Sequence, residues 1–293
     1  MTSRTLPALA LVFNALVFGV SWWPFRALQN QGLHPLWATA FIFLFSVVCI
    51  QLVRPGGWRA FAGQPLLWLL FAASGLTNVC FNWAVTIGDV VRVVLLFYVM
   101  PAWSVLLAWP LLREKPNAGS LFRLVLALSG VVIVLKTPDS PWPLPAQMAD
   151  WLALLGGFTF ALTNILLKKM AGTPESARML AMFGGGAVMA TAVALMGATI
   201  GLVNLPPAPA LGWLGLAVAV GLAILLGNLA LQYGAARLSA SATALIMLTE
   251  IIFASVSASL LGAGEITLRT LIGAGLILLA SLLSVLEPAR ASH

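Results

Sequence analysis

A chain of 293 residues could fold as one or two soluble domains, but this composition excludes that class. Charged residues are 8% of the chain and apolar residues 61%, whereas an average soluble protein is roughly 25% charged. So few charges cannot cover a water-facing surface, and most of the surface must therefore face lipid. The net charge of +7 does not indicate a nucleic-acid partner, because no basic cluster is interleaved with aromatic residues.

Ten apolar runs follow one another along the chain. Each is long enough, or nearly so, to cross a bilayer, which takes about 20 mostly apolar residues. The predicted spans are residues 7–25, 35–53, 65–87, 93–112, 121–135, 151–167, 179–201, 210–233, 239–262 and 270–286. The connections between them carry turn residues and are too short to hold a soluble domain. The sequence therefore predicts an all-α integral membrane protein with ten transmembrane helices.

The first span and the loop charges predict how the chain is oriented. Trp22-Trp23-Pro24 stands where small residues would precede a signal-peptide cleavage site, so we expect residues 7–25 to be a retained span. Lys and Arg favour cytoplasmic loops, and with a cytoplasmic N-terminus eleven of the fifteen fall on that side. An even number of spans then places both termini in the cytoplasm.

A shift of 150 residues aligns the two halves of the chain over one stretch without gaps. The aligned pairs are Asn78 with Asn228, Asn82 with Gln232, Trp83 with Tyr233, Leu95 with Leu245, and Met100 with Glu250. We interpret the match as an internal repeat, with residues 1–140 as the first five-helix unit and residues 141–293 as the second. Because five is odd, the second unit must be inverted in the membrane, and inverted repeats around a central site are a recurrent transporter architecture.

Two pairs of amides inside the spans are candidates for lining a central cavity. Asn78 and Asn82 are four residues apart and share a face of the third span, and Asn228 and Gln232 repeat this arrangement on the eighth. If the halves are inverted, the first pair lies toward the outside and the second toward the cytoplasm, at two ends of one pathway. The alternative is that these amides only bond neighbouring helices.

Glu250 is the one carboxylate well inside a predicted span. Ionisable groups in that position are costly and are usually functional. Glu250 would suit either proton-coupled exchange or the binding of a substrate ammonium group. The alternative is a structural carboxylate bonded to hydroxyls such as those of Thr243 or Thr249.

Further residues inside the spans are candidates for the cavity wall. Asn14 and Ser21 lie two turns apart on the first span, and Thr163 and Asn164 mark the matching sixth span. The aromatic candidates, which can present flat apolar walls to a substrate, are Trp22, Trp83, Tyr98, Trp103 and Tyr233. The alternatives are bonds to neighbouring helices for the polar residues and, for aromatic residues near span ends, a place in the membrane interface.

Several chemistries are not supported by the sequence. No glycine-rich phosphate loop followed by Lys and Ser or Thr is present, so we do not expect ATP to drive this chain directly. His34, His293, Cys49 and Cys80 are the only histidines and cysteines, and they do not form a zinc-site or triad pattern. We therefore expect no cofactor, no metal site and no enzymatic activity.

Three segments resemble the EamA-type transporters of the drug/metabolite transporter superfamily. Phe18-Gly19-Val20-Ser21-Trp22-Trp23 is similar to the family's Trp-Gly-Ser-x-Phe signature, and Met100-Pro101-Ala102-Trp103, running to Arg113-Glu114, is similar to its Pro-to-Glu segment. Thr249-Glu250-Ile251-Ile252-Phe253-Ala254 is similar to the second-half Glu-Pro-x-Phe-Ala, with Ile251 where Pro is usual. The resemblance extends over nearly the whole chain.

The resemblance implies a ten-helix secondary transporter of the bacterial inner (plasma) membrane, most similar to the branch that exports aromatic amino acids. On that basis we expect a carrier that moves amino acids, possibly aromatic, or similar small metabolites by alternating access, with small-molecule substrate and lipid as its only expected partners. The resemblance also implies a cavity lined by spans one, three, four, six, eight and nine. Rival interpretations are a nucleotide-sugar or cationic-drug carrier of the same fold and, in another class, a channel.

Overall fold

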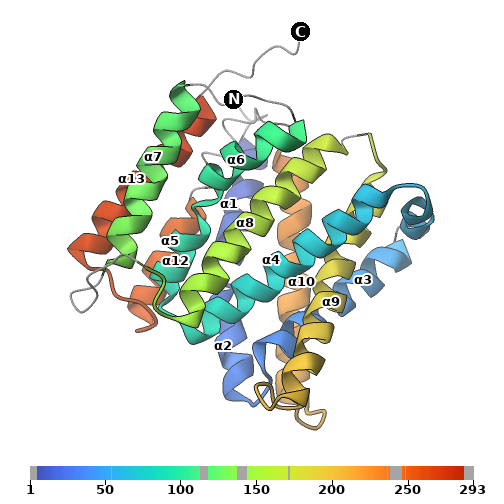
Figure 1. Cartoon of the computed structure of the whole chain (residues 1–293). Coiled ribbons are helices and arrows are strands. Elements are labelled where there is room, and N and C mark those ends of the chain that lie inside the picture. Colours follow the sequence, from blue (N-terminus) through green and yellow to red (C-terminus); the bar gives the residue numbers. More distant parts are fainter. Residues whose placement is uncertain are drawn as a thin grey trace.

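The computed structural model describes residues 5–53, 55–112, 118–136, 144–170, 172–235, 237, 246–247 and 249–286, and this part of the chain is all-helical (Figure 1). The first-half helices are α1 (Thr5–Val20), α2 (Trp22–Asn30), α3 (Pro35–Val53), α4 (Pro65–Ile87), α5 (Val90–Phe97), α6 (Met100–Leu112) and α7 (Ala118–Leu135), with a 3₁₀ turn at Gly57–Ala62. The second-half helices are α8 (Met148–Lys169), α9 (Glu175–Thr199), α10 (Leu211–Ala235), α12 (Thr249–Leu260) and α13 (Leu268–Leu286).

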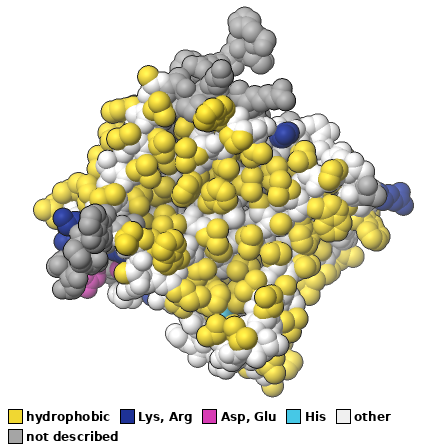
Figure 2. Space-filling model, in the orientation of Figure 1, with side chains coloured by type: hydrophobic (Ala, Val, Ile, Leu, Met, Phe, Trp, Pro, Cys, Tyr) yellow, Lys and Arg dark blue, Asp and Glu magenta, His cyan; other side chains and the backbone are white. Residues whose placement is uncertain are grey.

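Seven helical segments are long and apolar enough to cross a membrane. They are Thr5–Asn30, Pro35–Val53, Pro65–Ile87, Val90–Leu111, Met148–Lys169, Glu175–Thr199 and Leu211–Leu231. The other predicted spans correspond to shorter apolar helices at Leu121–Val134, Thr249–Leu260 and Leu268–Ala280. Figure 2 shows hydrophobic side chains over the middle of the visible face, with charged groups at its edges. The protein is therefore a multi-pass membrane protein.

The structure differs from the predicted spans in two places where a helix is interrupted. Ser21 separates α1 from α2, and its hydroxyl donates to the Phe18 carbonyl at 2.8 Å. Pro24 follows in the first turn of α2, where a proline lacking its N–H costs little, so the helix continues to Asn30 and not only to residue 25. Tyr98 and Val99 interrupt the fourth span in the same way, with Pro101 in the first turn of α6.

The principal contacts between the two halves of the chain are reciprocal. Helix α4 packs on α8, and the counterpart helix α10 packs on α1. Likewise, α5 and α6 pack on α8, and α12 packs on α1. The contact of α4 with α9 is matched by that of α10 with α3, and two pairs join direct counterparts: α3 with α9, and α7 with α13. Figure 1 shows α7 and α13 side by side at one edge of the bundle. Exchanging the halves leaves this contact pattern unchanged.

Glycines allow the closest helix approaches. A Cβ atom on Gly75 would lie 2.5 Å from the Gly185 carbonyl oxygen, so α4 and α9 meet backbone to backbone. Gly130 and Gly273 serve the same purpose between α7 and α13. A Cβ atom on Gly19 would lie 2.8 Å from the Glu250 carbonyl oxygen. Since small residues let helices approach closely in lipid, Gly19 holds α1 directly against the turn of α12 that carries Glu250.

Candidate functional site

A cavity of about 230 Å³ lies between the two halves of the bundle. Its lining comes from α1, α3, α4, α8, α9, α10 and α12, together with the end of α5. Spans two and seven therefore contribute in addition to those expected, through Phe43 on α3 and through Met182 and Phe183 on α9. The volume is near the lower end of ligand pockets, which are roughly 300–1,000 Å³. The space suits a small organic molecule.

Seven of the residues singled out from the sequence lie together in this lining. They are Asn14, Asn78, Tyr98, Thr163, Asn164, Asn228 and Glu250. Asn78 and Asn228 both lie in the wall of this one cavity. The lining also includes Ser74 and Thr77, one turn and one residue before Asn78, which the sequence analysis did not select.

The cavity amides are related by the repeat. Asn78 donates from Nδ2 to the Ser74 carbonyl at 2.8 Å, and Asn228 donates to the Ile224 carbonyl at 3.0 Å, so donor and acceptor are both offset by 150. The same offset pairs Asn14 with Asn164. These two differ in environment: Asn14 is fully buried and donates to the Gly227 carbonyl at 2.8 Å, whereas Asn164 is exposed.

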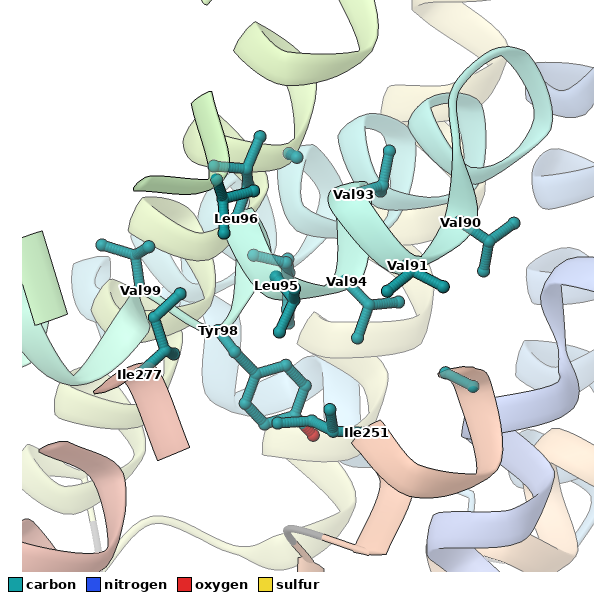
Figure 3. Close-up of a cluster of buried hydrophobic side chains, with 14 of the residues drawn as sticks. Val90, Val91, Val93, Val94, Leu95, Leu96, Tyr98, Val99, Ile251 and Ile277 are labelled. Atoms are coloured by element: carbon teal, nitrogen blue, oxygen red, sulfur yellow. The ribbon is translucent and has the colours of Figure 1, made fainter. Parts of the chain in front are cut away.

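Glu250 is held by a tyrosine from the other half of the chain. Tyr98 is buried and its hydroxyl donates a hydrogen bond to the Glu250 carboxylate. Figure 3 shows the Tyr98 ring pointing toward Ile251, the next residue after Glu250. The Thr249 hydroxyl instead donates to the Ile246 carbonyl at 2.6 Å, and Thr243 lies outside the described residues. Glu250 therefore joins α12 to the end of α5 at the cavity wall.

Phenylalanines form most of the apolar wall, and the sequence analysis missed them. Phe97 lies 4.7 Å from Phe81 and 5.4 Å from Phe160 between ring centroids, and Phe43 lies 5.5 Å from Phe183 on the other side. The sequence does contain a pattern that could have identified these phenylalanines: they lie about one helical turn from polar residues of the same span. Phe18 follows Asn14 by one turn, Phe81 follows Asn78, and Phe160 precedes Asn164.

Four candidates from the first half lie outside the cavity lining. Ser21 caps the break after α1, and Trp22 donates from Nε1 to the Ser257 hydroxyl at 3.0 Å. Asn82 donates to the Thr39 hydroxyl at 3.0 Å, which fastens α4 to α3. Trp83 packs edge-on against His34 with ring centroids 5.4 Å apart. These contacts hold helices together, which is the alternative that the sequence left open for polar residues.

The remaining candidates also lie away from the cavity or outside the described part. Trp103 packs edge-on against Phe158, and its Nε1 has no hydrogen-bond partner among the residues described. The Tyr233 ring lies under the Arg237 guanidinium, 3.9 Å from its centroid. The side chain of Gln232 is outside the described residues, as are Leu245 and the Arg113-Glu114 segment.

A second polar region lies at one end of the bundle, and we call it the charged end: Arg26, Asp89, Arg92, Asp150 and Glu265. Arg92 donates from Nε and Nη2 to the two oxygens of Asp150 at 2.7 and 2.9 Å. Its Nη1 donates to the Val134 carbonyl at 2.8 Å. Asp150 is 1% exposed and also accepts from two backbone N–H groups at the start of α8. This pair ties α5 to α7 and α8.

Asp89 extends the charged end across to the other half of the chain. It accepts from the backbone N–H of Arg92 and from that of Glu265, both at 2.8 Å. Arg26 donates to the carbonyls of Val85 and Gly88, and the N–H of Val90 donates to the Ala263 carbonyl at 3.1 Å. The turn between α4 and α5 is thereby bonded both to α2 and to the loop between α12 and α13.

An apolar helical bundle around a mostly apolar cavity with a few convergent polar groups is the architecture of a membrane transporter. The chain belongs to the EamA-like transporter family, whose family model matches residues 5–136 and again residues 147–286. Membership in a family of transporters indicates a role in transport and not in enzymatic catalysis.

Two individual comparisons agree with this assignment at different levels. The chain is 29% identical over 131 residues to an uncharacterized transporter of Pseudomonas aeruginosa, a match that covers 43% of this chain and 41% of the relative. The chain therefore spans less than half of the length of that relative. A solved crystal structure of a protein that is 16% identical superposes with a TM-score of 0.62, over 96% of this chain and 98% of that one. At that identity the likeness concerns the fold alone.

Proposed function

We propose that this protein is a secondary carrier that exports amino acids, possibly aromatic, or similar small organic metabolites across the bacterial inner membrane by alternating access. The observation that carries the proposal is the cavity between the two halves, to which both halves contribute matching amides with matching hydrogen bonds. The aromatic walls suit an apolar substrate body, and the amides with Glu250 suit its polar group. A channel would need a continuous polar path, and here the polar lining is local.

The proposed architecture is two five-helix repeats, residues 1–140 and 141–293, in opposite orientations. Reciprocal contacts of α4 with α8 and of α10 with α1 support a two-fold relation between the halves. Five spans in each unit then require the two units to cross the membrane in opposite orientations. In this architecture, three of the ten spans are shorter than the others: Leu121–Val134, Thr249–Leu260 and Leu268–Ala280. A cytoplasmic N-terminus follows from the loop charges, and ten spans place the C-terminus on the same side.

We propose that the charged end is the outer end of the protein. In this proposal, substrate is released when the charged end opens. Arg26, Arg92 and Arg269 all fall on the outer side in the proposed topology, whereas Leu167 and Met247 bring the cavity lining close to the inner helix ends. The bonds around Asp89 and Asp150 then close the outer path. Release to the outside requires that the two halves separate there while the inner path closes. Glu250 is proposed to carry the coupling proton.

Two measurements test this function. Purified protein in liposomes loaded with unlabelled amino acids should take up labelled amino acid by saturable counterflow, whereas a linear and unsaturable flux would contradict a carrier. Reporter fusions should place the segment after Leu112 in the cytoplasm and the loop at Glu265 outside. Finding both on the same side of the membrane would overturn the inverted repeat.

A nucleotide-sugar carrier of the same fold is the weaker alternative. No Lys, Arg or His occurs among the described residues of the cavity lining, so a diphosphate would meet no counter-charge there. The lining instead contains a carboxylate, which repels such a substrate.

A further inference from the structure

Resting on the proposed carrier function, we infer that the cavity recognises the ammonium group of a small aromatic amine and disfavours a substrate carboxylate. Among the small metabolites proposed as substrates, primary amines and amino acids whose carboxyl group is removed or esterified are therefore preferred to free amino acids. The inference concerns the substrate class of the cavity already described, and three features of its lining carry it: charge, hydrogen-bond inventory and shape.

The charge of the lining has one sign. Glu250 is the one ionisable carboxylate in it, and no Lys, Arg or His is present among the described lining residues. The arginines of the charged end are engaged there by Asp150 or by backbone carbonyls. A charge in an apolar interior is costly unless it is paired, so a bound cation relieves a cost that already exists. A bound carboxylate adds a second unpaired negative charge.

Three lining amides are oriented by bonds to backbone carbonyls, which leave each of them an amide oxygen and one further N–H. The Nδ2 of Asn14 donates to the Gly227 carbonyl, which fixes the amide orientation, and its Oδ1 is buried without a partner among the described residues. Asn78 and Asn228 likewise donate to backbone carbonyls, so their amide oxygens are the atoms left to accept. An orphaned buried acceptor is rare in a folded protein and indicates a missing donor.

The hydroxyl groups of the lining follow the same pattern. Ser74 donates to the Met182 carbonyl at 3.3 Å, Thr77 to the Ala73 carbonyl at 2.9 Å, and Tyr98 to Glu250. Thr163 has no partner among the residues described and can donate or accept. A primary ammonium has three donors and no acceptor, so it is the complement of this lining. A carboxylate has acceptors only; the Thr163 hydroxyl and the remaining N–H groups of the lining amides could donate to it, but it would meet the negative charge of Glu250.

The shape of the cavity selects the rest of the molecule. Phe81, Phe97 and Phe160 form one contiguous aromatic wall, and Phe43 with Phe183 forms another. A flat aromatic body fits between them, and ring faces also attract a cation. At about 230 Å³ the cavity suits a compact molecule such as a phenethylamine.

The test is a binding series that holds the aromatic body constant. The five probes are phenethylamine, phenylalanine methyl ester, phenylalanine, phenethyl alcohol and 3-phenylpropanoate, measured by calorimetry with the purified full-length protein. We expect the amine and the ester to bind roughly 10- to 100-fold more tightly than phenylalanine, the factor set by one charge-assisted hydrogen-bonded contact. We expect no measurable binding of the propanoate. Phenylalanine binding as tightly as its ester, or absence of amine binding, would overturn the inference.

Two variants and a matched control assign the effect to the carboxylate. Glu250→Gln should lower phenethylamine affinity roughly 10- to 100-fold and leave phenethyl alcohol affinity unchanged. Glu265→Gln removes the same charge from an exposed position at the charged end and should change neither. Tyr98→Phe frees the Glu250 oxygen and should keep or raise amine affinity; a loss of amine affinity equal to that of Glu250→Gln would mean that Tyr98 and Glu250 are only a structural pair.

A transport assay in liposomes distinguishes the proposal that the protein is a carrier from the inference that it prefers amines. Amine binding without saturable counterflow in liposomes would leave the inference in place and end the carrier proposal. Saturable counterflow of phenylalanine with weaker binding of its amine would leave the carrier and end the inference.

Discussion

Asp150 and Glu250 are both carboxylates on helices of an apolar bundle, but their partners differ. Asp150 receives a two-pronged contact from Arg92 and two backbone N–H groups, so its negative charge and both its oxygens are satisfied within the protein. Glu250 receives a hydrogen bond from Tyr98, a neutral group, and lines the same cavity as the Asn14 oxygen, which has no partner among the described residues. Within the described part of the chain, the fold satisfies one carboxylate and leaves the other without a counter-charge.

The difference teaches how to separate structural from ligand-binding polar groups in such a protein. At the charged end the polar groups close on one another and hold loops together, so their value lies in stability. In the cavity the polar groups are oriented by the backbone and keep acceptor capacity, and under the proposed function their value lies in what they bind. Four sets of substitutions test this division, beginning with the one that should cost the most stability.

The largest effect is expected from breaking the satisfied carboxylate. Asp150→Ala leaves the mostly buried Arg92 without its counter-charge, which typically costs about 3–5 kcal/mol. Thermal unfolding of the purified protein in detergent should show a large loss of stability. The double variant with Arg92→Leu should recover part of that loss, and equal stability of the single variant and the parent would contradict the structural role.

Glu250→Gln should change transport strongly and stability little, the reverse of what is expected for Asp150→Ala. The side chain keeps its shape and can still accept from Tyr98, so stability should change by less than about 1 kcal/mol. Transport in liposomes should fall roughly 100-fold and lose its dependence on pH, because the proposed coupling carboxylate is absent. If transport and its pH profile are unchanged, Glu250 does not carry the coupling proton.

Asn14→Ala removes the unpartnered acceptor together with the bond to Gly227. Substrate affinity should fall about tenfold, as expected for one lost hydrogen bond to a charged group. Asn82→Ala is the matched control, since Asn82 bonds Thr39 outside the cavity lining. That control should lower stability by about 1 kcal/mol without changing affinity. Equal affinity losses in both variants would remove the distinction between them.

The smallest effect compares the two repeats directly. Asn78→Ala and Asn228→Ala remove equivalent amides with equivalent backbone bonds, and each should weaken substrate binding by a few-fold, or about 1 kcal/mol. The two losses should agree within a factor of about two. Loss in only one variant would mean that the substrate lies against one repeat and that the amides are not functionally equivalent.

Much of the helical plan was predictable, because the periodicity of hydropathy is local and strong. The seven long candidate spans coincide with predicted ones. Pro101 in the middle of a predicted span indicates a kink there, and α5 ends at Phe97 just before it; the interruption at Ser21, before Pro24, was not predicted. Residues 239–245, the first part of the predicted ninth span, lie outside the described residues. The end of each helix was less predictable, since capping depends on only a few atoms.

The cavity residues were predictable only in part, for a geometric reason. Asn78 and Asn82 lie one turn apart, yet one reaches the cavity and the other bonds Thr39, because the rotation of α4 is set by its neighbours and not by its own sequence. Trp83 and Trp103 drew attention as aromatic candidates, but the walls are phenylalanines, which look like ordinary lipid-facing or core residues in a membrane sequence.

Helix α5 has a consequence for how the two polar regions communicate. Arg92, in its first turn, forms an ion pair with Asp150. Tyr98, directly after its last residue, donates a hydrogen bond to Glu250. The two residues are six positions apart, which corresponds to a rise of about 9 Å along a helix. If the charged end is the outer gate, as proposed, a shift of Arg92 away from Asp150 is expected to move Tyr98 as well, which would couple the Glu250 carboxylate to the opening of that gate.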